Sequence, residues 1–125
     1  MDSYSKNGLP PDFRVSYALY SAEEGGRKTP AVQHIRWDFR YDGKAISTST
    51  FMIWPEILQP NGQLITEPYV PAYGLADMFV VLPTSRALHQ QHIKVGLRGY
   101  FVEGPKRVAV CEVVAILNLH SNPVH

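Results

Sequence analysis

Few residues in this sequence combine the types and spacings that catalysis or metal binding requires. His89 and His92 are three residues apart, so one helical turn could direct both imidazoles toward a metal ion. No cysteine or carboxylate lies nearby in the sequence to complete a ligand set, and we therefore interpret both as surface histidines. The single cysteine, Cys111, lies among valines and is predicted to be a small core residue rather than a nucleophile.

Motifs of nucleophilic catalysis and of nucleotide binding are also missing from the sequence. There is no Gly-x-Ser-x-Gly turn to present a serine, and the adjacent carboxylates Glu23 and Glu24 are poorly placed for shared acid–base work. There is no Gly-x-x-x-x-Gly-Lys-[Ser/Thr] loop to hold a phosphate. We therefore expect a protein that is not an enzyme and that binds no nucleotide, metal or other cofactor.

The charged residues between positions 86 and 107 are mostly basic. Five cations and one carboxylate give this segment an excess of four positive charges in a nearly neutral protein. Cations near an exposed aromatic residue such as Tyr100 could follow a nucleic-acid backbone. The alternative is a solvated sheet surface balanced by carboxylates elsewhere, such as Glu56, Glu67 or Asp77. The residues of this predicted basic stripe are Arg86, Lys94, Arg98, Glu103, Gly104, Lys106 and Arg107.

A proline-rich stretch carries the second candidate contact surface. Trp54, Tyr69 and Tyr73 lie in residues 54–77, which are predicted to form a long loop because prolines cannot donate to a sheet. Aromatic side chains in such a loop offer a large contact area to a partner. The alternative is that they cover one open end of the fold.

The third candidate is the loop 23–30. Its two glycines could form a turn by adopting positive φ, with Arg27 paired to Glu23 or Glu24. Alternatively, the loop contacts a partner directly. The residues proposed for that contact are Arg27, Lys28, Thr29 and Pro30.

The elements that must position these surfaces are predicted to be β-strands. Apolar and polar residues alternate with a period of two in residues 13–19 and again in 35–41, and Asp42-Gly43 is typical of a tight hairpin turn. The predicted strands are residues 13–19, 35–41, 44–54, 78–82, 93–102 and 106–119, with one helical turn at 85–91 and a short edge strand near 63–66.

The final predicted strand is apolar on both faces. Val110 and Val114 lie on one face, and Cys111 and Val113 lie on the other. A strand of this kind is covered on both sides, or it displays an apolar stripe that another molecule must cover. We therefore expect a homodimer, since a specific interface typically hides about 800 Å² per partner.

Composition limits the chain to one folded domain. Its 125 residues are 45% hydrophobic and 18% charged, with a net charge of +1, so we expect neither a disordered tail nor a polycation. No apolar run is long enough to span a bilayer, and the first residues lack the apolar stretch of a signal peptide, which predicts a cytoplasmic location. Residues 1–11 are predicted to be a flexible leader, 12–120 an all-β, six- or seven-stranded antiparallel β-barrel, and 121–125 a frayed tail.

Several motifs follow one another as they do in a known family. Residues 17–30 contain a predicted strand that runs into Glu-Gly-Gly-Arg-Lys-Thr-Pro, and residues 96–104 read Gly-Leu-Arg-Gly-Tyr-Phe-Val-Glu-Gly. Residues 35–39 and 82–88 supply further matches in order. Together, these segments resemble the C-terminal β-barrel, or third domain, of translation elongation factor Tu, over residues 13–119. The resemblance implies that type of barrel, here as a stand-alone domain.

The same resemblance implies a binding role. In elongation factor Tu this barrel contacts aminoacyl-tRNA and packs against the other domains, and Glu103 and Gly104 match a tRNA-contacting pair of the family. Two residues depart from the pattern: Asp38 replaces a contacting glutamine and would repel phosphate, and Pro105 replaces a glycine and removes a backbone donor. We therefore expect a protein–protein interaction module, with RNA as the alternative partner.

Overall fold

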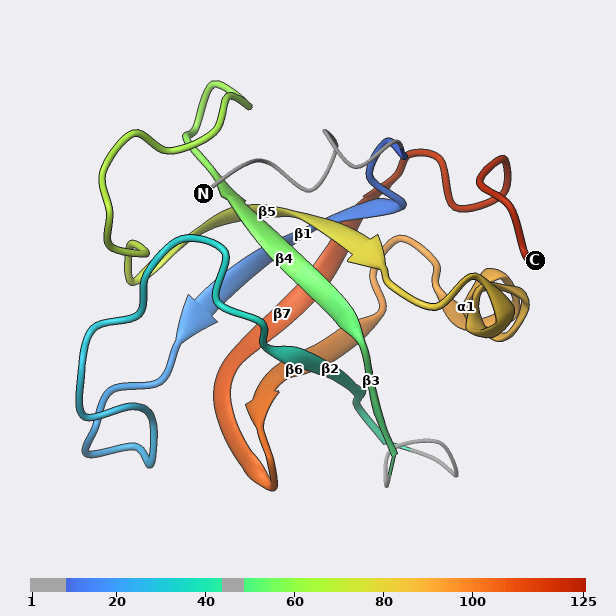
Figure 1. Ribbon diagram of the computed structural model, residues 1–125. Helices are drawn as coiled ribbons and strands as arrows, with labels where there is room; N and C mark the ends of the chain where they lie inside the picture. Colours follow the sequence, from blue (N-terminus) through green and yellow to red (C-terminus); the bar gives the residue numbers. More distant parts are fainter. Residues whose placement is uncertain (1–8, 44–48) are drawn as a thin grey trace.

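One antiparallel sheet forms most of the structure. The computed structural model describes residues 9–43 and 49–125, and its seven strands are ordered β3-β2-β6-β7-β1-β5-β4. The sheet is curled, so the fold is all-β and barrel-like, as the sequence predicts (Figure 1). The elements are β1 (Phe13–Leu19), β2 (Asp38–Tyr41), β3 (Thr50–Phe51), β4 (Ile53–Leu58), β5 (Tyr73–Val80), a 3₁₀-helix (Pro83–Ser85), α1 (Arg86–His92), β6 (Arg98–Glu103) and β7 (Lys106–Ile116).

The two edge strands of the sheet, β3 and β4, are consecutive in the chain and are separated only by Met52. β3 pairs with β2, and β4 pairs with β5 along its whole length. The carbonyl of Met52 accepts a hydrogen bond of 2.9 Å from the amide of Val81, just after β5. One stretch of chain therefore lies at both edges of the sheet, which explains how the sheet curls on itself.

Inward-facing residues of the strands, together with Trp37 just before β2, form an aromatic core. Phe13, Trp37, Phe39 and Phe101 are each at most 1% exposed. Trp37 stacks on Phe101 with the ring centroids 5.5 Å apart, and Phe13 meets Phe39 edge to face at 6.2 Å. The alternation of buried and less buried residues along β1 and β2 places Phe13 and Phe39 inside. The prediction of a strand at residues 13–19 is confirmed with its bounds unchanged.

The proline-rich stretch 54–77 is not one long loop, and that prediction is wrong at both ends. β4 contains Pro55, which is paired with Met78, and β5 already begins at Tyr73. Pro55 lacks an amide donor, but an edge strand tolerates it because only one side of β4 forms the ladder. The β4 segment is a strand because of its edge position in the sheet and in spite of the low strand propensity of proline.

Three predicted strands are shorter in the structure. β2 begins at Asp38, β6 begins at Arg98, and β7 ends at Ile116, whereas the pattern predicted bounds of 35, 93 and 119. Before β6, Gly96 adopts a φ of +94°, and a turn replaces the first residues of the predicted strand. The predicted helical turn is confirmed as the 3₁₀-helix followed by α1.

Two other predicted strands also differ from the structure. The edge strand expected near residues 63–66 is reduced to a single bridge between Leu58 and Leu64. The strand expected at 44–54 lies partly outside the described residues, and its remainder forms β3 and the start of β4.

Two bulges in β7 change which of its residues face outward. Val108 is the extra residue against β6, and Val114 is the extra residue against β1. As a result, Val108 is 1% exposed whereas Val114 is 40% exposed. Among the four valines of β7, Val114 is exposed, Val110 is half-buried, and Val108 and Val113 are buried. The outer face of the strand is therefore less apolar than the strict alternation predicted.

A buried ion pair joins the start of β1 to α1. Asp12 and Arg86 are each 1% exposed, and Nε of Arg86 donates a hydrogen bond of 2.8 Å to Oδ1 of Asp12. Nη2 of Arg86 donates to the Val80 carbonyl at 3.0 Å, and the Val80 amide donates to Oδ2 of Asp12 at 2.8 Å. Asp12, Arg86 and the end of β5 thus form one network in which both buried charges are paired.

The C-terminal tail completes this network. Asn122 is 7% exposed, and its Nδ2 donates to Oδ1 of Asp12 at 3.0 Å. Arg86 also donates to the carbonyl of Pro123. Residues 121–125 therefore differ from the frayed tail that the sequence predicted, because Asn122 and Pro123 are bonded to the barrel beside α1 (Figure 1).

The buried pair predicts a large loss of stability when one partner is removed. Arg86→Leu leaves the Asp12 carboxylate buried without its counter-charge, which should lower the free energy of unfolding by about 3–5 kcal/mol. The control is Arg14→Leu, which breaks a partly exposed pair with Asp77 and should cost at most about 1 kcal/mol. Urea unfolding followed by tryptophan fluorescence measures both, and equal losses would contradict this account.

Candidate functional site

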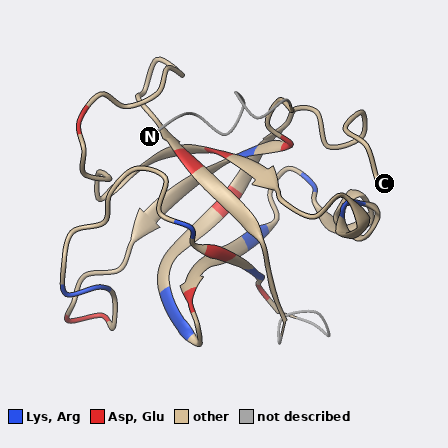
Figure 2. Ribbon diagram, viewed as in Figure 1, with Lys and Arg blue, Asp and Glu red and all other residues tan. Residues whose placement is uncertain are grey.

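The predicted basic stripe does not form a continuous surface. Arg86 is 1% exposed, so its prediction as a surface cation is wrong. Lys94 and Arg98 lie before and at the start of β6, whereas Lys106 and Arg107 lie on β7 opposite the far end of β6, roughly 14–17 Å away along the strand. Figure 2 shows the basic segments of the β6–β7 hairpin apart from one another. The stripe is therefore two separate groups of cations.

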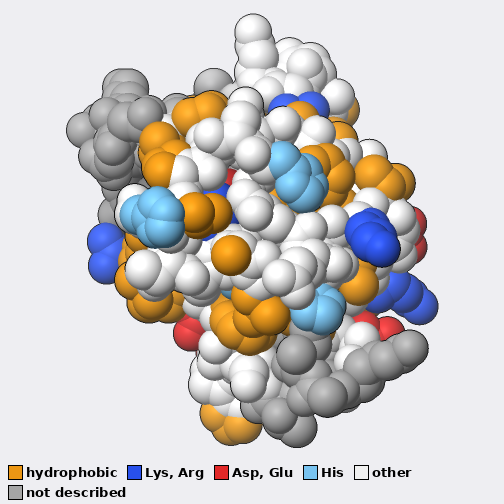
Figure 3. Space-filling view, turned by 90° about the vertical axis from the view of Figure 1, so that its right-hand side faces the viewer, with side chains coloured by type: hydrophobic (Ala, Val, Ile, Leu, Met, Phe, Trp, Pro, Cys, Tyr) orange, Lys and Arg blue, Asp and Glu red, His pale blue; other side chains and the backbone are white. Residues whose placement is uncertain are grey.

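Acidic residues lie opposite two of these cations. Arg98 is in register with Glu112, and Lys106 is in register with Glu103. On the face of the molecule that carries α1, Lys and Arg atoms also occur at separate places rather than in one band (Figure 3). The local excess of positive charge in the sequence therefore does not become a strong local field in the fold.

Tyr100, on β6, is in contact with one of the predicted stripe cations, Arg107. The guanidinium carbon of Arg107 lies 4.0 Å from the centroid of the Tyr100 ring. The Tyr100 hydroxyl donates a hydrogen bond of 2.8 Å to Oδ1 of Asp42, which raises the pKa of Tyr100. A nucleobase could stack near this ring, but the Asp42 carboxylate would repel the phosphate attached to it.

The loop 23–30 and the β6–β7 hairpin meet at an ion pair. Nη1 of Arg27 donates to Oε2 of Glu103, which also accepts from Nε1 of Trp37 at 2.6 Å. Arg27 donates further to the carbonyl and to the hydroxyl of Thr29, both at 3.2 Å. Arg27 therefore pairs across the fold and not with an adjacent glutamate, and each of its three nitrogens donates one hydrogen bond. The other predicted contact residues of this loop, Lys28, Thr29 and Pro30, are exposed.

The backbone conformation requires glycine at several positions of loop 23–30 and of the β6–β7 hairpin. Gly25 has a φ of +96°, and a Cβ on Gly26 would clash with the carbonyl oxygen of Tyr20. Gly104 has a φ of +59° at the first position of the two-residue turn, and Pro105 occupies the second. Of the two glycines predicted to adopt positive φ in loop 23–30, Gly25 does so, whereas Gly26 is required by the close approach of Tyr20, and no partner is needed to explain these residues.

The three predicted contact aromatics are not gathered on one surface. Trp54 lies opposite Phe79 of β5, six residues from Tyr73, which places the two about 20 Å apart along the strand. Trp54 is half-buried, and the guanidinium carbon of Arg36 lies 4.7 Å from its ring centroid. Tyr69 and Tyr73, in contrast, are 58% and 78% exposed. These two are therefore the members of the set that a partner can reach.

An open groove of about 780 Å³ lies beside Tyr73, between the loop that follows β4 and the start of β5. We call it the loop-side groove; its walls include Pro60, Ile65 and Pro71, and Glu67 is the one charged side chain among the described residues that line it. Its volume is in the range of ligand-binding clefts, whose walls are also mainly apolar. The proline-rich composition predicts that this segment is a contact surface. The groove itself forms only when the loop after β4 folds beside the start of β5.

The two long loops next to the loop-side groove are paired with each other. Val32 and Tyr69 form a β-bridge between the loop before β2 and the loop before β5. The side-chain amide of Gln33 accepts a hydrogen bond of 2.9 Å from the Ile57 amide and donates one of 2.8 Å to the Ile57 carbonyl. Gln33 thereby takes the place of a neighbouring strand on the outer edge of β4. The groove is bordered by loops that are bonded to the sheet.

A second buried pair fixes the loop before β2. Nε2 of His34 lies 2.7 Å from Oε2 of Glu56, and the two side chains are 5% and 4% exposed. His34 has a φ of +66°, which is uncommon for a residue other than glycine. Such a backbone conformation persists where the surrounding contacts hold it in place. The loop therefore has a defined conformation next to the groove.

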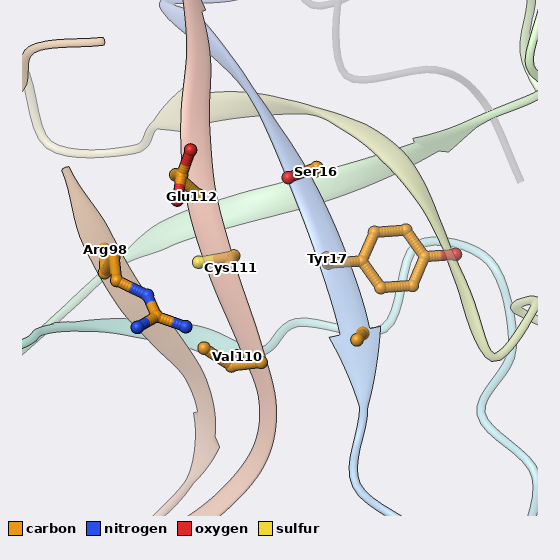
Figure 4. Close-up of a pocket in the computed structure, with 7 residues that line it drawn as sticks. Ser16, Tyr17, Arg98, Val110, Cys111 and Glu112 are labelled. Atoms are coloured by element: carbon orange, nitrogen blue, oxygen red, sulfur yellow. The ribbon is translucent and has the colours of Figure 1, made fainter. Parts of the chain in front are cut away.

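A shallower depression of about 200 Å³ lies on the outer face of β1, β6 and β7 (Figure 4). Arg98 and Glu112 extend from neighbouring strands beside it, and both are exposed, so the depression is an open surface rather than an enclosed site. Cys111 is 3% exposed, and its prediction as a core residue is confirmed. Burial raises the pKa of the Cys111 thiol, which keeps it protonated and unreactive.

His89 and His92 have different surroundings. His89 is fully buried, with Nδ1 2.7 Å from the Tyr41 hydroxyl and its ring 4.8 Å from that of Phe51, so its prediction as a surface residue is wrong. It lies on the side of α1 that packs on the sheet, whereas His92 is exposed as predicted. Burial lowers the pKa of His89 to about 4. Within residues 9–43 and 49–125, no group of three His, Cys, Asp or Glu side chains is placed to hold a metal ion.

No protein-family model matches this chain, and a search of curated proteins found no match either. In the part of the chain that the structure describes, no helix has the length and apolar character needed to cross a membrane.

The burial of His89 predicts that stability falls in acid. Its pKa is about 4 in the folded protein, below the ordinary value of 6.5, so the unfolded chain binds the proton more readily. The stability contributed by neutral His89 is complete above pH 6.5 and is lost as the pH falls toward 4, by roughly 3 kcal/mol in total. His89→Phe should remove this loss, whereas His92→Phe should retain it. Urea unfolding at pH 7 and pH 4.5 measures the difference, and an unchanged pH dependence in His89→Phe would refute the assignment.

Proposed function

We propose that this protein is a non-catalytic module that binds another protein at the loop-side groove. The observation that supports the proposal is a set of exposed apolar side chains at and next to the groove: Tyr73 lines it, and Val32, Leu64 and Tyr69 lie in the adjoining loops. Val32, Leu64, Tyr69 and Tyr73 are 48%, 37%, 58% and 78% exposed, and bridges join Val32 to Tyr69 and Leu64 to Leu58. Exposed apolar side chains that gather in this way are typical of interaction sites.

The open form of the groove favours a protein over a small molecule. Pro60, Glu67, Pro71 and Tyr73 all line it and are all exposed. A small ligand usually has most of its surface buried by its site, whereas a protein partner can cover an open groove together with its rim. Exposed tyrosines at the centre of such a surface supply much of the binding energy in known interfaces.

The proposed role agrees with the resemblance to the third domain of elongation factor Tu, to which we propose that this barrel is related. In that family the barrel supplies contacts and no catalytic groups. A second copy of the chain is one candidate partner, because β7 carries Val114, which is 40% exposed, and, four residues earlier, the half-buried Val110. We propose a cytoplasmic location from the sequence alone.

RNA is the second candidate partner, and one observation favours it. Arg107 stacks on Tyr100, and exposed Lys106 and Arg98 lie on the same hairpin. Two observations oppose it: these cations are separated along β6, and the Asp42 carboxylate is bonded to the Tyr100 hydroxyl. We therefore place the protein partner first.

The groove predicts that partner recovery requires Tyr73. Tagged wild type, Tyr73→Ser and Val95→Ser are purified, with and without nuclease treatment, from cells that naturally contain the protein, and co-purifying proteins are quantified by mass spectrometry. Val95 is the matched control, because it is an apolar side chain that is 65% exposed and does not line the groove. We expect the recovery of a specific partner to fall at least tenfold in Tyr73→Ser alone. Recovery that nuclease abolishes, or that Tyr73→Ser leaves unchanged, would contradict the proposal.

The salt dependence of binding separates RNA from protein. Contact with three or four phosphates gives a log–log slope of roughly −2 to −4, and Arg98→Ala should reduce that slope by about one. Labelled tRNA and a random single strand are titrated with the wild type and Arg98→Ala at two salt concentrations. Our proposal expects no saturable binding to either nucleic acid at low salt. Saturable binding with this slope would favour the RNA alternative.

A further inference from the structure

We infer that the loop-side groove binds an extended, proline-containing apolar peptide segment that carries a basic residue, and that Glu67 holds that basic residue. The inference rests on the proposed protein-binding function and specifies the chemistry of the partner. Three features of the groove support it: its charge, the composition of its walls, and the hydrogen bonds already made at the neighbouring edge of the sheet.

Glu67 gives the groove a negative charge without a counter-charge. No Lys or Arg occurs among the described residues that line the groove. Glu67 is exposed, and within residues 9–43 and 49–125 its carboxylate takes part in no ion pair. A lysine or arginine of the partner would form a charge-assisted hydrogen bond at this position, and an acidic residue would be repelled. The groove therefore selects a basic ligand.

The walls of the groove suit an extended apolar chain. Pro60, Ile65 and Pro71 offer apolar surface without side-chain hydrogen-bond donors. Tyr73 adds a flat ring, 78% exposed, with a hydroxyl at its tip. Peptides in the polyproline II conformation pack on such rings, while the hydroxyl can donate to a peptide carbonyl. Because this conformation is largely set before binding, an open groove can hold it at a low cost in entropy.

Addition of the peptide as a further strand is less suited to this site. The outer edge of β4 at Ile57 is already bonded to the side chain of Gln33, and the amide of Ile65 donates to the Ile57 carbonyl at 3.3 Å. A new strand would have to displace both contacts. Side-chain packing in the groove, rather than main-chain pairing with β4, therefore holds the peptide.

Selection of peptides from a random library tests the inference. Twelve-residue peptides displayed on phage are selected on the wild type, and the peptides obtained are synthesised and titrated by fluorescence anisotropy. We expect them to share a lysine or arginine beside proline or aliphatic residues. Glu67→Gln should weaken their binding about two- to fivefold, and Glu67→Lys at least tenfold. Glu23→Lys makes the same charge change at an exposed position outside the groove and should leave binding unchanged.

The outcomes separate this inference from the proposed function. Peptides that lose binding in Tyr73→Ser but carry no basic residue, or that bind Glu67→Gln as tightly as the wild type, would overturn the inference and leave the groove as a protein-binding site. A selection that yields no peptide, or only peptides whose binding is independent of Tyr73, would overturn both.

Discussion

The barrel depends on the buried ion pair between Asp12 and Arg86, because neither charge is tolerated in the interior without the other. The hydrogen bonds of these two side chains reach the end of β5 at Val80 and the C-terminal tail at Asn122 and Pro123. If one of these segments moves away, a buried polar group loses its partner. Apolar burial supplies most of the favourable free energy of folding, and the ion pair determines which segments meet at this end of the barrel.

The loop-side groove lies at the other end of the same strand. β5 runs from Tyr73 at the groove to Val80 at the ion pair, roughly 24 Å away, and it is paired with β1 on one side and β4 on the other. Figure 1 shows α1 on one side of the sheet and the long loops, residues 20–37 and 59–72, on the opposite side. Since the amide of Ile65 and a bridge between Leu58 and Leu64 bond the second of these loops to β4, the groove is largely ordered before a partner arrives, which lowers the entropic cost of binding.

Sequence reasoning predicts the parts of this structure that depend on local pattern. Alternation along residues 13–19 gives β1 and the all-β class, because alternate burial is a property of a single strand. Pro55 leads to the wrong prediction of a loop, because the edge position of β4, where proline is tolerated, follows only from the order of the strands. Arg86 resembles any surface cation in the sequence, and its burial follows from Asp12, which is 74 residues away. Tyr73 is predicted as a contact residue, but its distance from Trp54 and the groove beside it appear only when distant segments pair.

Amide hydrogen exchange, measured on the free protein and on its complex with the recovered partner, tests most directly whether the partner binds at the loop-side groove. The groove predicts slower exchange in the complex at residues 31–33 and 59–75, with little change at the β6–β7 hairpin. Slower exchange at residues 98–112, with no change at 59–75, would contradict a groove-binding module and place the partner on the hairpin instead.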